Sequence, residues 1–143
     1  MTFITDLQFG NKFQAEYIKT MIPTPLNIEI MEGYYKEYDF IADGIKYEVK
    51  SDRMTFATGN ICIEYECSGK PSGISLSTAD FWIYIVLDKQ QIVETYKIPS
   101  SFIKSQIEAK TYTRECKGGD NWKCKLYLFK KSMFDSYKCH VKN

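Results

Sequence analysis

Residues 34–50 read YYKEYDFIADGIKYEVK, and this stretch decides the fold. Two runs of alternating apolar and polar side chains flank Asp43-Gly44, a dipeptide that accepts the positive φ angles of a two-residue hairpin turn. Such a turn sets the register of the two strands, so Asp39 is expected opposite Glu48. The sequence therefore predicts a β-hairpin with an acidic pair across its strands.

Side chains alternate between the two faces of a strand, so this hairpin has one apolar and one charged face. The apolar face is expected to pack into a core and consists of Tyr38, Phe40, Ala42, Ile45, Tyr47 and Val49. The charged face consists of Glu37, Asp39, Ile41, Lys46, Glu48 and Lys50, with Glu37 opposite Lys50.

The acidic pair calls for a chemical explanation. Like charges directly opposite each other cost about 0.2–1 kcal/mol of sheet stability. A divalent cation removes this repulsion, because carboxylate oxygens are ligands that magnesium and manganese prefer. Lys50 points to the same face as Asp39 and Glu48, where its ammonium group can hold a water or neutralise charge on a phosphate.

Outward from the hairpin, the sequence predicts an α/β domain. Apolar spacing predicts a helix over residues 10–21, which Pro23 and Pro25 stop. A short helix is expected over 77–81 and a longer one from Pro99 to about Lys110. Further strands are expected over residues 60–67, 82–87, 92–98 and 122–129. The expected order is α-β-β-β-α-β-β-α-β, a mixed sheet flanked by helices.

The composition fits one globular domain over residues 1–143, with 44% hydrophobic and 15% aromatic residues. No apolar run approaches the roughly 18 residues of a membrane span. Residues 1–11 carry no basic-then-apolar start of a secretory signal. We therefore expect an intracellular chain without a membrane partner.

The charge is divided unevenly along the chain. Residues 1–96 hold 8 basic and 14 acidic side chains, whereas residues 97–143 hold 11 and 4. An acidic segment joined to a basic one is compatible with a metal site beside a polyanion-binding surface, and also with ordinary solvated charge.

The cysteines are expected to be reduced thiols, because their number is odd and their spacing is not that of a small disulfide scaffold. They are Cys62, Cys67, Cys116, Cys124 and Cys139. The single histidine, His140, weighs against a mechanism based on catalytic histidine. Cys116, Cys124, Cys139 and His140 lack the spacing of a known zinc finger, and we expect no zinc site from them.

Asp39, followed across the turn by Glu48-Val49-Lys50, resembles the core motif of the PD-(D/E)XK nuclease superfamily. The helix over 10–21 and the order of elements up to residue 110 are similar to that superfamily's core. Tyr38 stands where the motif often has proline. The resemblance implies a restriction-endonuclease-like core over about residues 10–110, followed by a basic C-terminal segment, 111–143.

The resemblance implies an endodeoxyribonuclease that depends on Mg2+, or on Mn2+, and hydrolyses phosphodiester bonds. Asp39, Glu48 and the Val49 carbonyl are then expected to bind the metal, and Lys50 to act on the water or the phosphate. Glu16 matches an acidic residue of the first helix and is expected to be an auxiliary ligand or base. Asp39, Glu48, Lys50 and Glu16 are thus the candidate catalytic residues.

The small size resembles a Holliday-junction resolvase or a phage or viral endonuclease, in the cytoplasm of a bacterial or virus-infected host cell. Cutting both strands of branched or duplex DNA implies a homodimer. Two alternatives stay open. One is a non-catalytic nucleic-acid-binding protein that keeps the nuclease fold, and the other is a small metabolic or inhibitor protein whose hairpin carboxylates are coincidental.

Further side chains are candidates for DNA contacts. They are Lys12, Arg53, Lys70 and Ser72, where the loop 69–73 is equally compatible with a plain turn. Lys123, Lys125, Lys130 and Lys131 either contact DNA or protect an edge strand from aggregation. Glu64, in the strand over 60–67, is either a further metal ligand or part of a solvated face.

Overall fold

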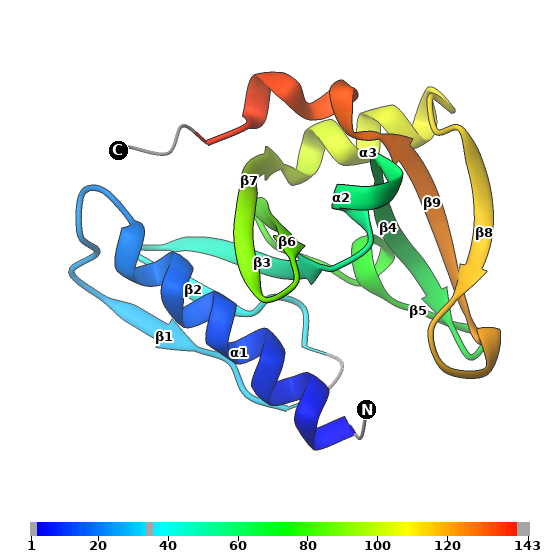
Figure 1. Cartoon of the computed structure of the whole chain (residues 1–143). Helices are drawn as coiled ribbons and strands as arrows, with labels where there is room; N and C mark the ends of the chain where they lie inside the picture. The colour runs from blue at the N-terminus through cyan, green and yellow to red at the C-terminus, as the bar shows by residue number, and fades with distance from the viewer. Residues whose placement is uncertain (1–2, 34–35, 140–143) are drawn as a thin grey trace.

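The structure is a computed structural model that describes residues 3–33 and 36–139. It is a mixed α/β arrangement with two sheets (Figure 1). In chain order the elements are α1 (Phe3–Thr20), β1 (Ile28–Ile30), β2 (Phe40–Ala42), β3 (Ile45–Asp52), α2 (Thr55–Thr58), β4 (Asn60–Cys67), β5 (Lys70–Pro71), the 3-10 helix η1 (Gly73–Ser75), β6 (Phe81–Asp88), β7 (Gln91–Pro99), α3 (Ser100–Glu108), β8 (Arg114–Gly118), η2 (Asp120–Trp122), β9 (Cys124–Lys130) and η3 (Lys131–Tyr137).

The hairpin forms in the predicted register. β2 pairs antiparallel with β3, so that Ala42 lies opposite Ile45 and Phe40 opposite Tyr47. Asp43 and Gly44 adopt φ angles of 49° and 84°, the left-handed region that this turn requires. The turn is therefore encoded locally, by two residues that tolerate positive φ.

The paired part of the hairpin is shorter than predicted, because β2 begins at Phe40. The predicted pair between Glu37 and Lys50 is wrong: the Glu37 carbonyl accepts the Thr78 N–H at 2.9 Å, and its carboxylate accepts the Thr78 hydroxyl at 3.3 Å. Tyr38, expected on the same face as Phe40 and Tyr47, instead packs against the core cluster on the opposite side of the sheet, which contains Trp82. The backbone leaves the ladder where the Asp39 side chain takes over a strand hydrogen bond.

β2 and β3 belong to a five-stranded sheet, sheet A, in the order β1-β2-β3-β6-β7. β3 and β6 run parallel, and the other neighbours are antiparallel. The carboxylate of Asp43 adds β1 to the edge by accepting the N–H groups of Leu26 and Asn27, at 2.9 Å for Asn27. The predicted strand over 82–87 is confirmed in β6, whose continuous apolar run is buried on both faces.

α1 covers one face of sheet A (Figure 1). Phe13 of α1 packs in a buried cluster with Phe40, Ala42, Tyr47, Ile83, Ile85 and Leu87. The helix begins at Phe3 rather than at residue 10, since one internal glycine, Gly10, costs about 1 kcal/mol and does not end a helix. None of the helices in the described part of the chain has the length and hydrophobicity that crossing a membrane requires.

A second sheet, sheet B, lies against the other face of sheet A (Figure 1). Its strands follow the order β5-β4-β9-β8 and are all antiparallel. Ile61, Ile63 and Phe129 of sheet B are buried with Trp82 and other residues of sheet A in one cluster, which α3 and η3 complete. Sheet A is thus the middle layer, and the basic C-terminal segment contributes two strands, β8 and β9, to the domain.

Parts of the predicted order are wrong. The short helix over 77–81 does not form: Phe81 begins β6, and the Ser77 hydroxyl at the expected helix start accepts the Trp82 indole N–H at 3.2 Å. The elements β1, α2, β5 and β8 were not predicted, because segments of two to five residues carry too little periodicity. The strands over 60–67 and 92–98 and the helix from Pro99 are confirmed as β4, β7 and α3.

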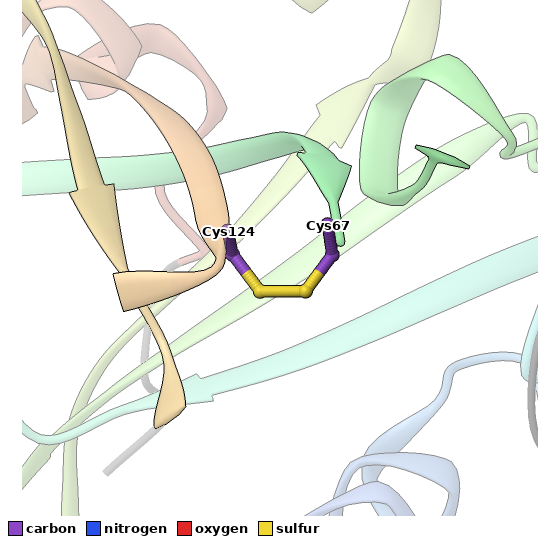
Figure 2. Close-up of a disulfide and its surroundings, with 2 residues drawn as sticks. All are labelled: Cys67 and Cys124. Atoms are coloured by element: carbon purple, nitrogen blue, oxygen red, sulfur yellow. A yellow bond between two sulfur atoms is a disulfide. The ribbon is translucent and has the colours of Figure 1, made fainter. Parts of the chain in front are cut away.

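Two of the cysteines form a disulfide, so the prediction of reduced thiols is wrong for them. Cys67, at the end of β4, is bonded to Cys124, at the start of β9 (Figure 2). The two residues lie directly opposite each other in the sheet, although 57 positions separate them in the chain. Cys62, Cys116 and Cys139 are free thiols, and His140 lies outside the described residues.

Candidate functional site

Glu48 and Lys50 lie together on β3. They are the register partners of Trp82 and Tyr84 in the parallel strand β6, so their side chains leave sheet A on the side that faces sheet B. The Lys50 ammonium is 3.4 Å from Glu48 Oε1 and 5.9 Å from the centre of the Trp82 ring. The alternation of β3 thus separates this charged pair from Tyr47 and from the α1 side.

Asp39 joins them from the start of the hairpin. Its Oδ2 accepts the Val49 N–H at 2.6 Å, and its Oδ1 lies 3.0 Å from the Lys36 ammonium. Its negative charge also raises the pKa of both Glu48 and Lys50. The predicted cross-strand pair of Asp39 with Glu48 does not form, because the ladder begins at Phe40 and the Asp39 N–H donates to the Tyr47 carbonyl at 2.8 Å. The Asp39 carboxylate nevertheless lies near enough to act on both Glu48 and Lys50; we call these three residues the hairpin site.

The two carboxylates of the hairpin site are buried, with 6% of Asp39 and 9% of Glu48 exposed. Burial, opposed by Lys50 and reinforced by Asp39, raises the pKa of Glu48 to about 7. Glu48 Oε2 is buried and accepts no hydrogen bond from a described residue. Such an oxygen is costly to leave without a partner, so it is a place where a proton or a cation would be stabilised.

Lys50 is the accessible member, with 41% of its side chain exposed. Desolvation lowers its pKa, but the carboxylates of Glu48, Asp39 and Glu64 together outweigh this effect and raise it above the ordinary value. Lys50 is therefore a cation near neutral pH. It can attract an anion or orient a water, but it is not a base.

Glu64 lies near this charged group. It is half-buried on β4, and its negative charge raises the pKa of Lys50. The neighbouring acidic residue Glu66 instead forms an ion pair with Lys125 of β9 at 3.0 Å. Of the two acidic residues of this strand, Glu64 is the one that the structure places toward the hairpin site.

Glu16 is half-buried on α1, the helix that packs on the opposite face of sheet A. No described hydrogen bond or ion pair joins Glu16 to Asp39, Glu48 or Lys50. The Val49 group that contacts Asp39 is the N–H rather than the carbonyl. The metal-related roles of Glu16 and of the Val49 carbonyl stay predictions.

The four candidate DNA contacts lie on separate elements. Lys12 is exposed on α1, with its ammonium 5.3 Å from the centre of the Phe13 ring. Arg53 and Lys70 are exposed, after β3 and in β5. Ser72 and its hydroxyl oxygen are buried, so a contact between this hydroxyl and DNA would require movement of the loop.

Two of the four C-terminal lysines that are candidates for DNA contacts are held in ion pairs. Lys125 pairs with Glu66, and Lys131 lies 2.6 Å from Glu94. Lys123 and Lys130 are exposed. Phosphate contacts through Lys125 or Lys131 would therefore have to compete with carboxylates of this chain.

Sequence reasoning missed two neighbours of the hairpin site, Lys36 and Trp82. Lys36 stands three residues before Asp39 and partly neutralises it, a spacing that carries no signal outside a helix. Trp82 is a buried core residue, and the centre of its ring also lies 5.9 Å from the Lys50 ammonium. The partner of Lys50 across the sheet could be identified only once β6 was known to pair with β3.

The arrangement combines two buried carboxylates with a protonated lysine. Carboxylate oxygens of Asp39 and Glu48 form the donor set that Mg2+ and Mn2+ prefer, and the unpartnered Glu48 Oε2 fits a cation ligand. Protein-family models gave no match to this chain, and a search of the curated proteins gave none either.

Proposed function

We propose that this chain is a divalent-metal-dependent endodeoxyribonuclease with a restriction-endonuclease-like core. The observation that carries the proposal is the hairpin site: two buried carboxylates and a protonated lysine on one side of a β-hairpin. A helix precedes the hairpin, and a parallel strand follows beside β3. This arrangement supports the resemblance to the PD-(D/E)XK superfamily that the motif suggests.

Asp39 and Glu48 would hold Mg2+ or Mn2+ through carboxylate oxygens. When bound, such an ion lowers the pKa of a water and neutralises charge on a phosphate. The chain supplies the rest. Lys50 remains protonated and reaches solvent, so it can bind a phosphate oxygen and stabilise the charge that develops there. Lys36 and the Val49 N–H keep the Asp39 carboxylate in place.

DNA is the substrate that fits this proposal, and a cut in both strands requires two sites, hence a homodimer. Branched, duplex and single-stranded DNA all present the same phosphodiester to the hairpin site. A Holliday-junction resolvase is the form we favour. The location that goes with such a substrate is the cytoplasm of a bacterial or virus-infected cell.

The test is a cleavage assay on a panel of labelled branched, duplex and single-stranded DNAs, with Mg2+, with Mn2+ and with a chelator. Wild-type protein should cut at least one DNA with metal and none with chelator, whereas Glu48→Gln and Asp39→Asn should not cut. Glu66→Gln is the matched control, because it neutralises a carboxylate that pairs with Lys125 instead. Equal cutting by wild type and Glu48→Gln would contradict the proposal.

One observation favours a second function, nucleic-acid binding without catalysis. Lys36 already pairs with Asp39, and a pKa of about 7 leaves Glu48 partly protonated at neutral pH, so the site is partly neutralised without metal. Calorimetry separates the two functions. Heat from Mg2+ or Mn2+ that Glu48→Gln abolishes supports the nuclease, whereas DNA binding without metal uptake supports the binding protein.

A further inference from the structure

A second group of possible metal ligands lies toward the C-terminal end of β4. The sulfurs of Cys67 and Cys124 and a carboxylate oxygen of Glu64 all lie within 4.8 Å of one another. Glu64 and Cys67 belong to β4. Cys124 begins β9, and Figure 2 shows it bonded to Cys67. We call these three residues the bulge site.

A β-bulge brings Glu64 to the same side as Cys67. In a regular strand, residues three positions apart point to opposite faces. Here the register slips between Glu64 and Glu66: Glu64 pairs with Leu126, but Glu66 already pairs with Lys125. The extra residue, Tyr65, shifts the alternation by one, so Glu64 and Cys67 face the same side. The bulge therefore places the Glu64 carboxylate beside the two cysteine sulfurs.

The surroundings suit a ligand site that opens to solvent. Glu64 and Cys67 are half-buried, and Cys124 is buried. The turn after β8 closes the site on the Cys124 side, since a Cβ added at Gly119 would lie 2.9 Å from the Cys124 sulfur. Gly119 also adopts a φ of 72°. Only glycine lets the backbone approach the sulfur so closely in this conformation.

We propose that the bulge site is a redox-gated zinc site: the disulfide excludes the metal, and reduction creates a Cys67–Cys124–Glu64 ligand set that takes Zn2+. A dithiol reductant supplies two electrons and two protons to the disulfide, which becomes two thiols, and the dithiol becomes a disulfide. Zn2+ then displaces both thiol protons and binds two thiolates and the Glu64 carboxylate. A water completes the tetrahedron.

The size and chemistry of the group match this ion. Two thiolates on a tetrahedral zinc ion lie about 3.8 Å apart for Zn–S bonds of about 2.3 Å, a separation below the 4.8 Å within which the three ligand atoms lie. Thiolates select zinc over magnesium, whereas the all-oxygen hairpin site favours magnesium or manganese. The inference therefore stands independently of the proposed nuclease activity.

The experiment uses Co2+ as a spectroscopic probe of the full chain. The protein is reduced with a phosphine, freed of reductant without oxygen, and titrated with Co2+ and then Zn2+. We expect the reduced protein to bind one equivalent of Co2+. The complex should show tetrahedral d–d bands and a sulfur-to-cobalt charge-transfer band, and Zn2+ should remove both. The oxidised protein should show neither band, and reoxidation should release the metal.

Variants assign the ligands. Cys67→Ser and Cys124→Ser should lose the charge-transfer intensity of a two-thiolate site. Glu64→Gln, which keeps both sulfurs, should retain it with affinity weakened about ten-fold or more. Cys116→Ser and Glu66→Gln are matched controls and should behave like wild type, and circular dichroism identifies any variant that has not folded. Equal Co2+ binding by oxidised protein, no binding by reduced protein, or unchanged affinity in Glu64→Gln would each overturn the proposal.

Discussion

The hairpin site, on sheet A, and the bulge site, on sheet B, both contain carboxylates, but they are assembled in different ways. Asp39, Glu48 and Lys50 are brought together by one two-residue turn. The bulge site depends on pairing between β4 and β9 and on one extra residue in β4. The first is a local structure with oxygen ligands, and the second is a long-range structure with sulfur ligands. They are therefore expected to respond to different metals and different mutations.

The largest expected effect separates the two sites by substitution. Glu48→Gln should reduce Mg2+-dependent DNA cleavage by at least about 10³-fold, while cobalt binding by the reduced protein stays unchanged. Cys67→Ser should do the reverse: it should lose the cobalt spectrum and still cut DNA. Cleavage rates and cobalt titrations on the same preparations check this. Loss of both properties in either folded variant would show that the sites are not separate.

The disulfide should dominate the stability of the bulge region. Closing a loop between positions 57 apart stabilises a protein by about 4 kcal/mol in the chain-entropy model. The double variant Cys67→Ser/Cys124→Ser should therefore unfold at much lower urea concentration than oxidised wild type. The reduced wild type without metal should resemble the double variant. Cys116→Ser keeps both cysteines of the disulfide, so it should match the stability of wild type in both redox states.

The pH dependence of stability should report the hairpin site. The folded-state pKa of Glu48, about 7, lies above its ordinary value. The folded protein therefore binds this proton more tightly than the unfolded chain, and the favourable contribution is lost as pH rises from about 4.5 through 7. In metal-free buffer Glu48→Gln should exceed wild type in stability at pH 8 by up to about 3 kcal/mol, and by much less at pH 5. Urea titrations at both pH values check this.

Glu66→Gln is the control for Glu48→Gln and should show no gain in stability over wild type between pH 5 and pH 8. Mg2+ should stabilise wild type at pH 8 but leave Glu48→Gln unchanged, because only the charged carboxylate binds the cation. If wild type is as stable as Glu48→Gln at pH 8 without metal, then the buried, charged Glu48 carboxylate does not destabilise the folded protein.

The smallest effect concerns the turn. Gly44 has a φ of 84°, and a Cβ there would meet no atom within 4 Å. Gly44→Ala should therefore cost only the left-handed conformation, about 1 kcal/mol, and should leave the cobalt spectrum of the bulge site unchanged. Thermal unfolding and the cobalt titration check this. A loss well above 2 kcal/mol would mean that the hairpin depends on more than its local turn.

Much of the hairpin site could be predicted from the sequence. Asp43-Gly44 identifies the turn, and alternation then assigns Glu48 and Lys50 to one face. The prediction failed where other parts of the chain compete with the ladder. Thr78 binds Glu37, and the Asp39 side chain replaces a backbone acceptor. Neither effect leaves a periodic signal in the residues around the turn.

The sequence by itself determined the turn, the pairing of residues 40–42 with 45–47 and the shared face of Glu48 and Lys50. These follow from the φ preferences of two residues and the period of a strand. Only the tertiary structure decided that Glu48 and Lys50 share a side with Trp82 and Tyr84 of β6, that the charge of Glu64 acts on Lys50, and that Cys67 is bonded to Cys124. The physical reason is distance along the chain. Contacts between β4 and β9 must overcome the loop entropy of a long separation, and burial of Ile61, Ile63 and Phe129 supplies the free energy. Such burial depends on where every layer packs, which no local pattern encodes.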